Sequence, residues 1–251
     1  MSALVSSIRE RYQHTLDSIA ASARKAGRDP DSVRLVVVTK LQPVEVVRAA
    51  LDAGAKILGE NYPEEAVRKI TELKSANALK PSEIAVEWHI IGHVQGRKAR
   101  LVAGHFDLFQ SLDSLKLAER VDRFAAEFNR TLPVLLEFNV GGEESKSGWD
   151  ASDETRWTGL LNDVNAVASL AHLQIRGLMT MPPLFADPEA ARPYFRRLQR
   201  LRDFMVEHVP QAEWRELSMG TSADYPVAVE EGATLVRVGQ AILGPRSRSG
   251  D

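Results

Sequence analysis

The side chain best suited to covalent chemistry in this sequence is a lysine that closes a short apolar run. Lys40 ends the run Leu-Val-Val-Val-Thr-Lys, and two-residue alternation along a strand places it on the same face as Val36 and Val38. If these valines fill an apolar interior, desolvation lowers the pKa of the ammonium group, and the neutral amine can attack a carbonyl carbon. This pattern favours a Schiff-base lysine. The alternative is a lysine that ends its strand and reaches solvent.

Two glycine-containing segments near the end of the chain could bind a phosphate group. They are Leu-Ser-Met-Gly-Thr-Ser at 217–222 and Val-Gly-Gln-Ala at 238–241. The candidate residues in them are Ser218, Gly220, Thr221 and Gly239. Because glycine lets backbone N–H groups approach a ligand closely and hydroxyl groups add donors, a phosphate would need no basic patch there. The alternative is that both segments are ordinary turns between a strand and a helix.

An arginine lies in the last apolar run, Leu-Val-Arg-Val-Gly at 235–239. Alternation places Arg237 on the same face as Gly239, where a ligand could approach the backbone. A guanidinium group on an inward face needs an anionic or polar partner. That partner is either a bound ligand or a carboxylate on another strand, such as Glu137.

Eight short runs rich in β-branched residues must position these side chains. They alternate with amphipathic stretches of helical length, a pattern that predicts parallel strands joined by crossover helices. Eight such repeats predict a single α/β domain over residues 1–251, a (β/α)₈ TIM-type barrel, preceded by an extra helix at residues 2–27. The predicted strands span residues 34–40, 56–61, 86–92, 108–113, 133–140, 173–181, 214–220 and 235–240.

Functional residues of such barrels gather where the C-terminal ends of the strands meet. The loops after the seventh and eighth strands form the usual phosphate site of this architecture, and here they are the two glycine-containing segments. Asn61 ends the second predicted strand and belongs to the same end of the barrel. We therefore expect Lys40, Asn61, Arg237 and both loops to lie at one end of the barrel.

The overall composition excludes several other classes of function. With 32 Lys and Arg against 34 Asp and Glu, the net charge of -2 offers no general attraction to nucleic acid or to an anionic membrane. The absence of cysteine removes disulfides, thiolate metal sites and thiol nucleophiles. No uncharged apolar run approaches the roughly 20 residues that a membrane span requires. We expect a cytoplasmic protein without nucleic-acid or membrane partners.

Metal-binding and nucleotide-binding motifs give no further site. His89 and His93 are four residues apart, but no third ligand stands at a metal-site spacing. We therefore expect core or hydrogen-bonding roles for both histidines and no metal. The glycine motif of dinucleotide-binding folds, the Walker-type loop and the hydrolase nucleophile motif are all absent from the sequence.

Seven segments that span nearly the whole chain occur in one order. They are Val-Thr-Lys-Leu-Gln-Pro at 38–43, Gly-Glu-Asn-Tyr at 59–62, Trp-His-Ile-Ile-Gly-His-Val-Gln at 88–95, Ser-Lys-Ser-Gly at 145–148, Arg-Gly-Leu-Met-Thr-Met at 176–181, Leu-Ser-Met-Gly-Thr-Ser at 217–222 and Val-Arg-Val-Gly at 236–239. Together they resemble the pyridoxal 5′-phosphate (PLP) homeostasis protein family, of the YggS/PROSC type. Several motifs in one order make this resemblance far more specific than any one of them.

The resemblance implies a barrel like the N-terminal domain of alanine racemase, of PLP fold type III, with PLP held as a Schiff base on Lys40. It also implies that Asn61 lies beside the cofactor and that Arg237 faces the pyridine nitrogen. The implied phosphate-binding residues are Ser218, Gly220 and Gly239. The sequence departs from the family at Gln240, where a small hydroxyl residue is frequent, and at Gly-Arg-Lys 96–98, where Ser-Asn-Lys is common. The first departure bears on one phosphate hydrogen bond.

Three hypotheses of function follow. An arginine at the pyridine nitrogen disfavours ring protonation and makes PLP a weak electron sink, so the leading hypothesis is a monomeric PLP carrier in PLP homeostasis, without efficient catalysis. Its recipients would be PLP-dependent apo-enzymes. The alternative is a fold-type III amino-acid racemase, with Lys40 as one base and Tyr62 or Tyr225 as the other. The third hypothesis is a lysine-dependent aldolase or phosphosugar enzyme that uses the same loops.

Overall fold

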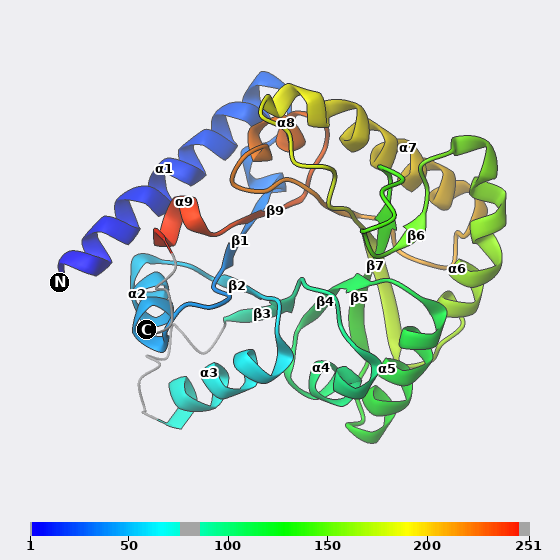
Figure 1. The fold of residues 1–251 in the computed structure, drawn as a ribbon, viewed down its shortest axis with the longest axis horizontal. Coiled ribbons are helices and arrows are strands. Elements are labelled where there is room, and N and C mark those ends of the chain that lie inside the picture. Colours follow the sequence, from blue (N-terminus) through cyan, green and yellow to red (C-terminus); the bar gives the residue numbers. More distant parts are fainter. Residues whose placement is uncertain (1, 76–85, 246–251) are drawn as a thin grey trace.

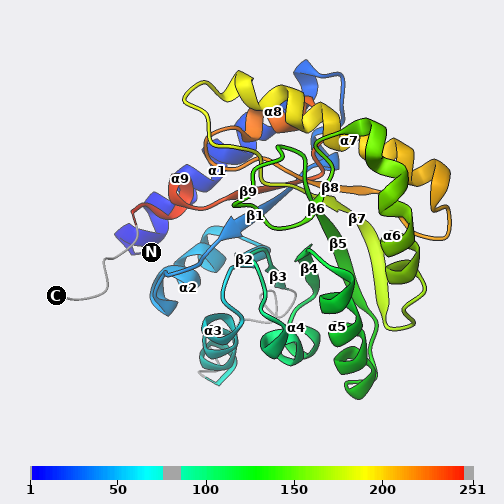
Figure 2. The same ribbon diagram turned by 45° about the vertical axis from the view of Figure 1, so that its right-hand side comes forward.

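Eight parallel strands close into a barrel in the computed structural model, which describes residues 2–75 and 86–245. The strands are β1 (Arg34–Val38), β2 (Ile57–Glu60), β3 (Glu87–Ile90), β4 (Leu108–Leu112), β5 (Leu132–Asn139), β7 (Leu173–Met179), β8 (Glu216–Ser218) and β9 (Leu235–Val238). The pairings of β4 with β5 and of β1 with β9 complete the closure (Figures 1 and 2). The predicted (β/α)₈ barrel is confirmed.

A helix follows every barrel strand and covers the outside of the barrel (Figure 1). These helices are α2 (Val44–Ala53), α3 (Pro63–Ser75), α4 (Ala99–His105), α5 (Leu115–Glu127), α6 (Leu161–Ala168), α7 (Arg192–His208), α8 (Tyr225–Glu230) and α9 (Gln240–Leu243). Each crossover helix returns the chain to the same end of the barrel, which makes neighbouring strands parallel. Among the helices of residues 2–75 and 86–245, none has the length and apolar character that a membrane span requires.

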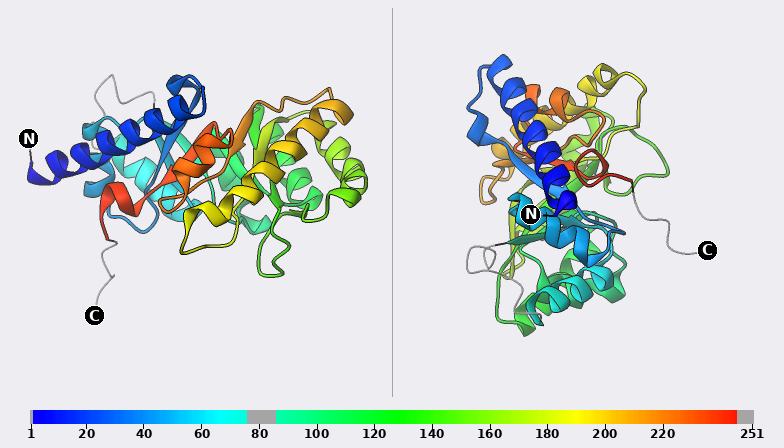
Figure 3. Two further views of the ribbon diagram at one scale, coloured as in Figure 1. Left: turned by 90° about the horizontal axis from the view of Figure 1, so that it is seen from above. Right: turned by 90° about the vertical axis from the view of Figure 1, so that its left-hand side faces the viewer.

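An additional helix, α1 (Ala3–Lys25), precedes the first strand, as predicted for residues 2–27. The Ser2 hydroxyl caps it by accepting a hydrogen bond from the Val5 N–H at 3.3 Å. Val5, Ile8 and Ile19 lie on its buried face, and the helix packs against α2, α8 and α9 (Figures 1 and 3). It therefore joins the helix that follows β1 to the two helices that precede and follow β9.

The buried side chains of residues 2–75 and 86–245 form two hydrophobic clusters, and the smaller lies inside the barrel. Its members are Val36, Ile57, Leu108, Leu135, Met179 and Leu235. The larger cluster packs the strands against the helices and includes Val37. Val36 and Val37 thus belong to different clusters, as the two-residue alternation predicted for this strand requires. The face that carries Val36 points inward, as the assignment of Lys40 requires.

Several strands end earlier than predicted. β1 ends at Val38 rather than at Lys40, because the chain turns at Leu41, whose φ is 58°. β8 and β9 are also shorter than the predicted runs at 214–220 and 235–240. A two-residue strand that was not predicted, β6 (Trp149–Asp150), pairs with the end of β5. Most of the predicted site residues therefore lie on turns just past the strands.

Candidate functional site

A cavity of about 400 Å³ lies at the C-terminal ends of the barrel strands. This volume is within the range of roughly 300–1,000 Å³ that is typical of small-molecule sites. The lining residues are Val38, Lys40, Asn61, Ile91, Met181, Leu184, Thr221, Ser222, Ala223, Arg237, Gly239 and Gln240. We refer to it below as the lysine cavity.

Five of the seven predicted site residues line the lysine cavity. They are Lys40, Asn61, Thr221, Arg237 and Gly239. They follow or belong to β1, β2, β8 and β9, so only closure of the barrel brings them together. The half-buried side chain of Lys40 shares this cavity with both glycine-containing loops.

Arg237 is the most deeply buried charged residue of this lining. Its guanidinium group donates to Ser218 Oγ, to the carbonyl oxygen of Thr180 at 2.9 Å and to Met181 Sδ at 2.9 Å. Burial lowers the pKa of Arg237 to about 10, against the attraction of the Glu137 carboxylate. Within the described residues, its hydrogen bonds and ion pairs do not include Glu137, so the direct ion pair considered from the sequence is not formed.

Ser218 lies beneath the lysine cavity rather than in its lining. Its hydroxyl group accepts from Arg237 and donates to Gln110 Oε1 at 2.6 Å. The Gln110 amide nitrogen lies 2.8 Å from His89 Nδ1, so a chain of polar side chains crosses the barrel interior. Ser218 therefore acts on the cavity by orienting Arg237. His89 has the hydrogen-bonding role predicted for it, whereas Gln110 was not predicted.

Two glycines beside the cavity lie where a side chain would have little room. Gly220 has a φ of 91°, and a Cβ atom there would lie 2.6 Å from Ala228 Cβ. Gly220 does not line the cavity, but it shapes the turn that precedes Thr221. At Gly239, a Cβ atom would lie 3.0 Å from the carbonyl oxygen of Val38, at the close approach of β9 to β1.

In the loop after β8, the hydroxyl group available to a ligand is that of Ser222 rather than that of the predicted Thr221. Thr221 donates from both its backbone N–H, at 2.6 Å, and its hydroxyl, at 3.0 Å, to Asp224 Oδ1. Ser222 Oγ accepts from the Gly239 N–H at 3.4 Å, and no described residue takes up its own proton, which a ligand could accept. Ser222 was missed as an individual candidate, although it lies in the predicted segment. Gln240, the position that departs from the family, also lines the cavity.

Glu137 on β5 is a second buried ionisable group at this end of the barrel. Its side chain is 8% exposed, and its Oε2 atom has no hydrogen-bond partner in the described part of the chain. Burial, together with the nearby Asp113 carboxylate, raises the pKa of Glu137 to about 7 against the opposing attraction of the Arg237 charge. Gly148, with a φ of 99°, lets the following loop pass so close that a Cβ there would lie 2.5 Å from the Glu137 carbonyl oxygen.

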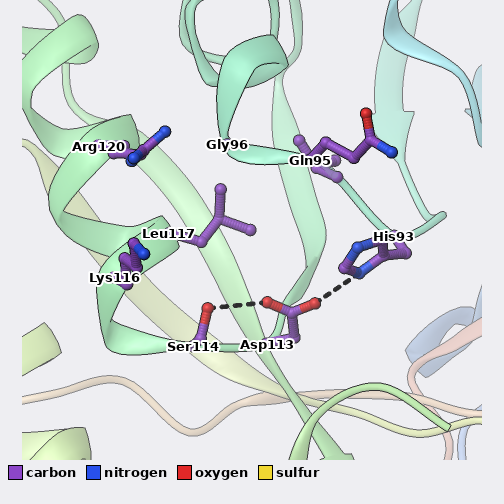
Figure 4. A pocket seen from close by; sticks show the side chains of 9 residues that line it. His93, Gln95, Gly96, Asp113, Ser114, Lys116, Leu117 and Arg120 are labelled. Carbon is purple, nitrogen blue, oxygen red and sulfur yellow. Dashed lines mark hydrogen bonds and ion pairs between the residues drawn. The ribbon is translucent and has the colours of Figure 1, made fainter.

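A second cavity, of about 280 Å³, lies beside the loops after β3 and β4 (Figure 4). In Figure 4, Asp113 lies between Ser114 and His93, with the Ser114 hydroxyl 3.0 Å and His93 Nδ1 2.7 Å from its carboxylate oxygens. This cavity also contains Lys116. None of the seven predicted site residues lines it, so of these two cavities it is the lysine cavity that contains both the amine and the phosphate loops.

A closed (β/α)₈ barrel with an extra N-terminal helix and a lysine in the cavity at its C-terminal end defines the class of the alanine racemase N-terminal domain. The family model described as "Alanine racemase, N-terminal domain" matches residues 12–247. The alanine racemase of Clostridium difficile superposes with a TM-score of 0.65 over 97% of this chain and 58% of that chain. Because the two sequences are 13% identical, this likeness shows the fold alone.

Closer relatives define the family within this class. The pyridoxal phosphate homeostasis protein of Vibrio alginolyticus is 36% identical, over 98% of this chain and 100% of its own. That of Aquifex aeolicus is 37% identical, over 94% and 97%. PipY of Synechococcus elongatus, solved with PLP bound, is 35% identical with a TM-score of 0.77, over 94% of this chain and 100% of PipY. The chain belongs to the pyridoxal phosphate homeostasis protein family, as its seven segments predicted.

Proposed function

We propose that this chain binds PLP as a Schiff base on Lys40 and serves as a PLP carrier in PLP homeostasis, without efficient catalysis of its own. The observation that carries this proposal is the single cavity that joins Lys40 to the loops after β8 and β9. An amine suits the aldehyde of PLP, and a loop of glycine and hydroxyl residues suits its phosphate. The PLP-bound structure of PipY supports the choice of ligand. The proposed recipients are PLP-dependent apo-enzymes of the cytoplasm.

The residues around the lysine cavity fit the parts of PLP. Lys40 supplies the amine, while Ser222 and Gly239 supply a hydroxyl and a backbone that a phosphate can approach. Asn61 is held in the lining, because Gly92 packs so close that a Cβ at 92 would lie 2.7 Å from Asn61 Cβ. The predicted residues that act indirectly, by holding Arg237 or the loop after β8, are Ser218, Gly220 and Thr221.

Arg237 favours holding the cofactor over turning over a substrate. Bound PLP supplies an electron sink for carbanions, and the sink is strong when the pyridine nitrogen is protonated. The pKa of Arg237, about 10, keeps the guanidinium group charged at neutral pH. A fixed positive charge facing the ring nitrogen disfavours its protonation, because like charges repel. Efficient racemisation is therefore not part of the proposal.

The positions of two tyrosines also disfavour the racemase alternative. Racemisation needs a second base on the face of the substrate opposite Lys40. Tyr62 is 46% exposed and Tyr225, the first residue of α8, is 9% exposed. Neither tyrosine lines the lysine cavity. The cavity therefore supports a carrier better than a racemase.

Borohydride reduction tests the assignment of the lysine. Protein incubated with PLP should turn yellow, and reduction should leave a stable adduct on the peptide that contains Lys40, located by mass spectrometry. Lys40→Ala should lose this adduct, whereas Lys116→Ala, which removes the lysine of the second cavity, should keep it. An adduct on a different peptide of the wild-type chain would refute the assignment.

Mixing the PLP complex with a PLP-dependent apo-enzyme tests the carrier role. Enzyme activity should return in proportion to the complex added, and the borohydride-reduced complex should restore none. Loss of optical activity from an L-amino acid incubated with the complex would instead favour the racemase.

A further inference from the structure

A buried lysine lies directly behind the turn that carries Lys40. Lys69 on α3 is 4% exposed, and its ammonium nitrogen lies 2.7 Å from the carbonyl oxygen of Thr39. The same nitrogen lies 2.7 Å from Glu60 Oε1 and 2.6 Å from Glu65 Oε1. An ammonium group has three protons to donate, so each has an acceptor inside the protein.

These contacts reach both peptide groups that flank Lys40. The Thr39 carbonyl belongs to the peptide bond that enters Lys40, and Lys69 donates to it. The Leu41 N–H belongs to the peptide bond that leaves Lys40, and it donates to Glu65 Oε1 at 2.7 Å. One ion pair on α3 therefore holds the main chain on both sides of Lys40.

The turn itself needs such a restraint. Leu41 has a φ of 58°, a left-handed conformation that is unfavourable for leucine. A strained residue keeps its conformation only where the surrounding contacts determine it, and such residues cluster at ligand sites. Leu41 is half exposed, so packing of its side chain does not explain the conformation. A local hydrogen bond closes the turn, because the Gln42 N–H donates to the Thr39 carbonyl oxygen at 3.1 Å. The hydrogen bond from the Leu41 N–H to Glu65 ties this turn to α3.

Stability alone is a weak explanation for this buried ion pair. Removing two charges from water costs free energy that their attraction barely offsets, and apolar residues of similar volume often replace buried pairs without loss. The three acceptors of Lys69 instead specify one geometry for the chain around it. That chain is the turn of the residue proposed to bind PLP.

We infer that Lys69 and Glu65 form a positioning clamp that holds the main chain on both sides of Lys40, so that its amine meets the aldehyde carbon of PLP. The inference rests on the proposed function. The Lys40 nitrogen forms a double bond to that carbon, and the aldehyde oxygen leaves with two protons as water. A displacement of about 1 Å in a reacting group can slow a reaction about 10²-fold. The phosphate loops follow β8 and β9, so loss of the clamp should leave phosphate binding intact.

Glu65→Ala is the most direct test, because it removes the acceptor of the Leu41 N–H while Lys69 keeps the Thr39 carbonyl and Glu60 as partners. The visible band formed with PLP should grow about 10- to 100-fold more slowly than in wild type. Affinity for pyridoxine 5′-phosphate, which has an alcohol in place of the aldehyde, should change less than about two-fold, because it needs no aligned amine. Glu65→Gln keeps an oxygen that accepts from the Leu41 N–H and should recover most of the rate. Lys69→Met, checked for folding by circular dichroism, should be slowed at least as much as Glu65→Ala.

Lys98→Met is the matched control. Lys98 pairs with Glu64, the neighbour of Glu65 on α3, at 2.8 Å, so the variant removes a lysine–glutamate pair without touching the Lys40 turn. It should form the band at the wild-type rate. A wild-type rate in Glu65→Ala, an equal slowing in Lys98→Met, or a parallel loss of rate and pyridoxine 5′-phosphate affinity would each overturn the clamp. Absence of any adduct on Lys40 in wild type would overturn the proposed function itself, and the two failures are thus distinct.

Discussion

Charged side chains are partly exposed at the N-terminal end of the barrel and buried at its C-terminal end. At the N-terminal end, Arg34 pairs with Glu216 at 2.8 Å and with Glu87 at 3.5 Å, and all three side chains stay partly exposed around a hollow of about 340 Å³. At the C-terminal end, Arg237 and Glu137 are only 3% and 8% exposed, and Glu137 Oε2 has no hydrogen-bond partner among the described residues.

This difference in exposure indicates different roles for the charged residues at the two ends. Partly exposed ion pairs contribute about 0 to 1 kcal/mol, because water screens them. Burying a charge costs several kcal/mol unless partners compensate, and Arg237 and Glu137 compensate each other through space rather than by a direct bond. Buried groups with shifted pKa values at the mouth of a barrel are typical of ligand sites. The C-terminal end is therefore built for a ligand.

The largest effect is expected from removing the buried charge at the C-terminal end. Arg237→Met leaves Ser218 Oγ and the Thr180 carbonyl without this donor, and it removes a compensating charge from Glu137. Breaking a buried charge partnership costs about 3–5 kcal/mol, so the free energy of unfolding in urea should fall by that amount. PLP affinity, measured by the visible band, should fall with it. Unchanged stability and affinity would show that the two ends do not differ.

An intermediate effect, dependent on pH, is expected at Glu137. Burial raises the pKa of Glu137 from 4.5 to about 7, so between these values the folded chain keeps a proton that the unfolded chain has released. The free energy of unfolding contributed by this group therefore falls as pH rises through that window and levels off above about 7. The shift corresponds to about 3 kcal/mol. Glu137→Gln removes this titration. The free energy of unfolding of the variant minus that of wild type should therefore rise by about this amount from pH 4.5 to pH 8.

Urea unfolding at several pH values measures this difference. Glu144→Gln, at an exposed glutamate in the loop after β5, is the matched control and should stay within about 0.5 kcal/mol of wild type at every pH. If Glu137→Gln and wild type have parallel pH profiles, the pKa of Glu137 is not raised in the folded protein, and the contrast between the two ends is weakened.

The barrel could be predicted from the sequence because its signals are local. Eight β-branched runs separated by amphipathic stretches each give a strand and a helix, and their number determines the closure. The exact ends could not be predicted. At the turn after β1, the Gln42 N–H bonds the Thr39 carbonyl locally, but the Leu41 N–H also donates to Glu65, 24 residues away, and no local pattern indicates that contact. Strand β6 was missed because Trp149 and Asp150 become a strand only by pairing with the end of β5.

The site could be predicted where strand order alone brings residues together. Lys40 and Arg237 follow or belong to the neighbouring strands β1 and β9, so closure of the barrel makes them neighbours. The contact of Gln110 with Ser218 depends on which side chains meet across the interior, and no sequence spacing encodes it. Glu65 and Lys69 are visible as a pair four residues apart, but that spacing is typical of exposed helix surfaces. Only burial distinguishes this pair.

The smallest effect is expected from the same substitution at the N-terminal end. Arg34→Met removes both ion pairs of a side chain that is 40% exposed, so the free energy of unfolding in urea should fall by no more than about 1 kcal/mol. The PLP band should form at the wild-type rate, because Arg34 begins β1 and Lys40 lies past its other end. β1 and β9 are paired so that Arg34 opposes Leu235 and Val36 opposes Arg237. The two arginines thus stand two positions apart in one ladder, and a difference in stability between Arg34→Met and Arg237→Met measures burial rather than strand context. Equal losses would mean that the exposed pairs stabilise the barrel as much as the buried charge does.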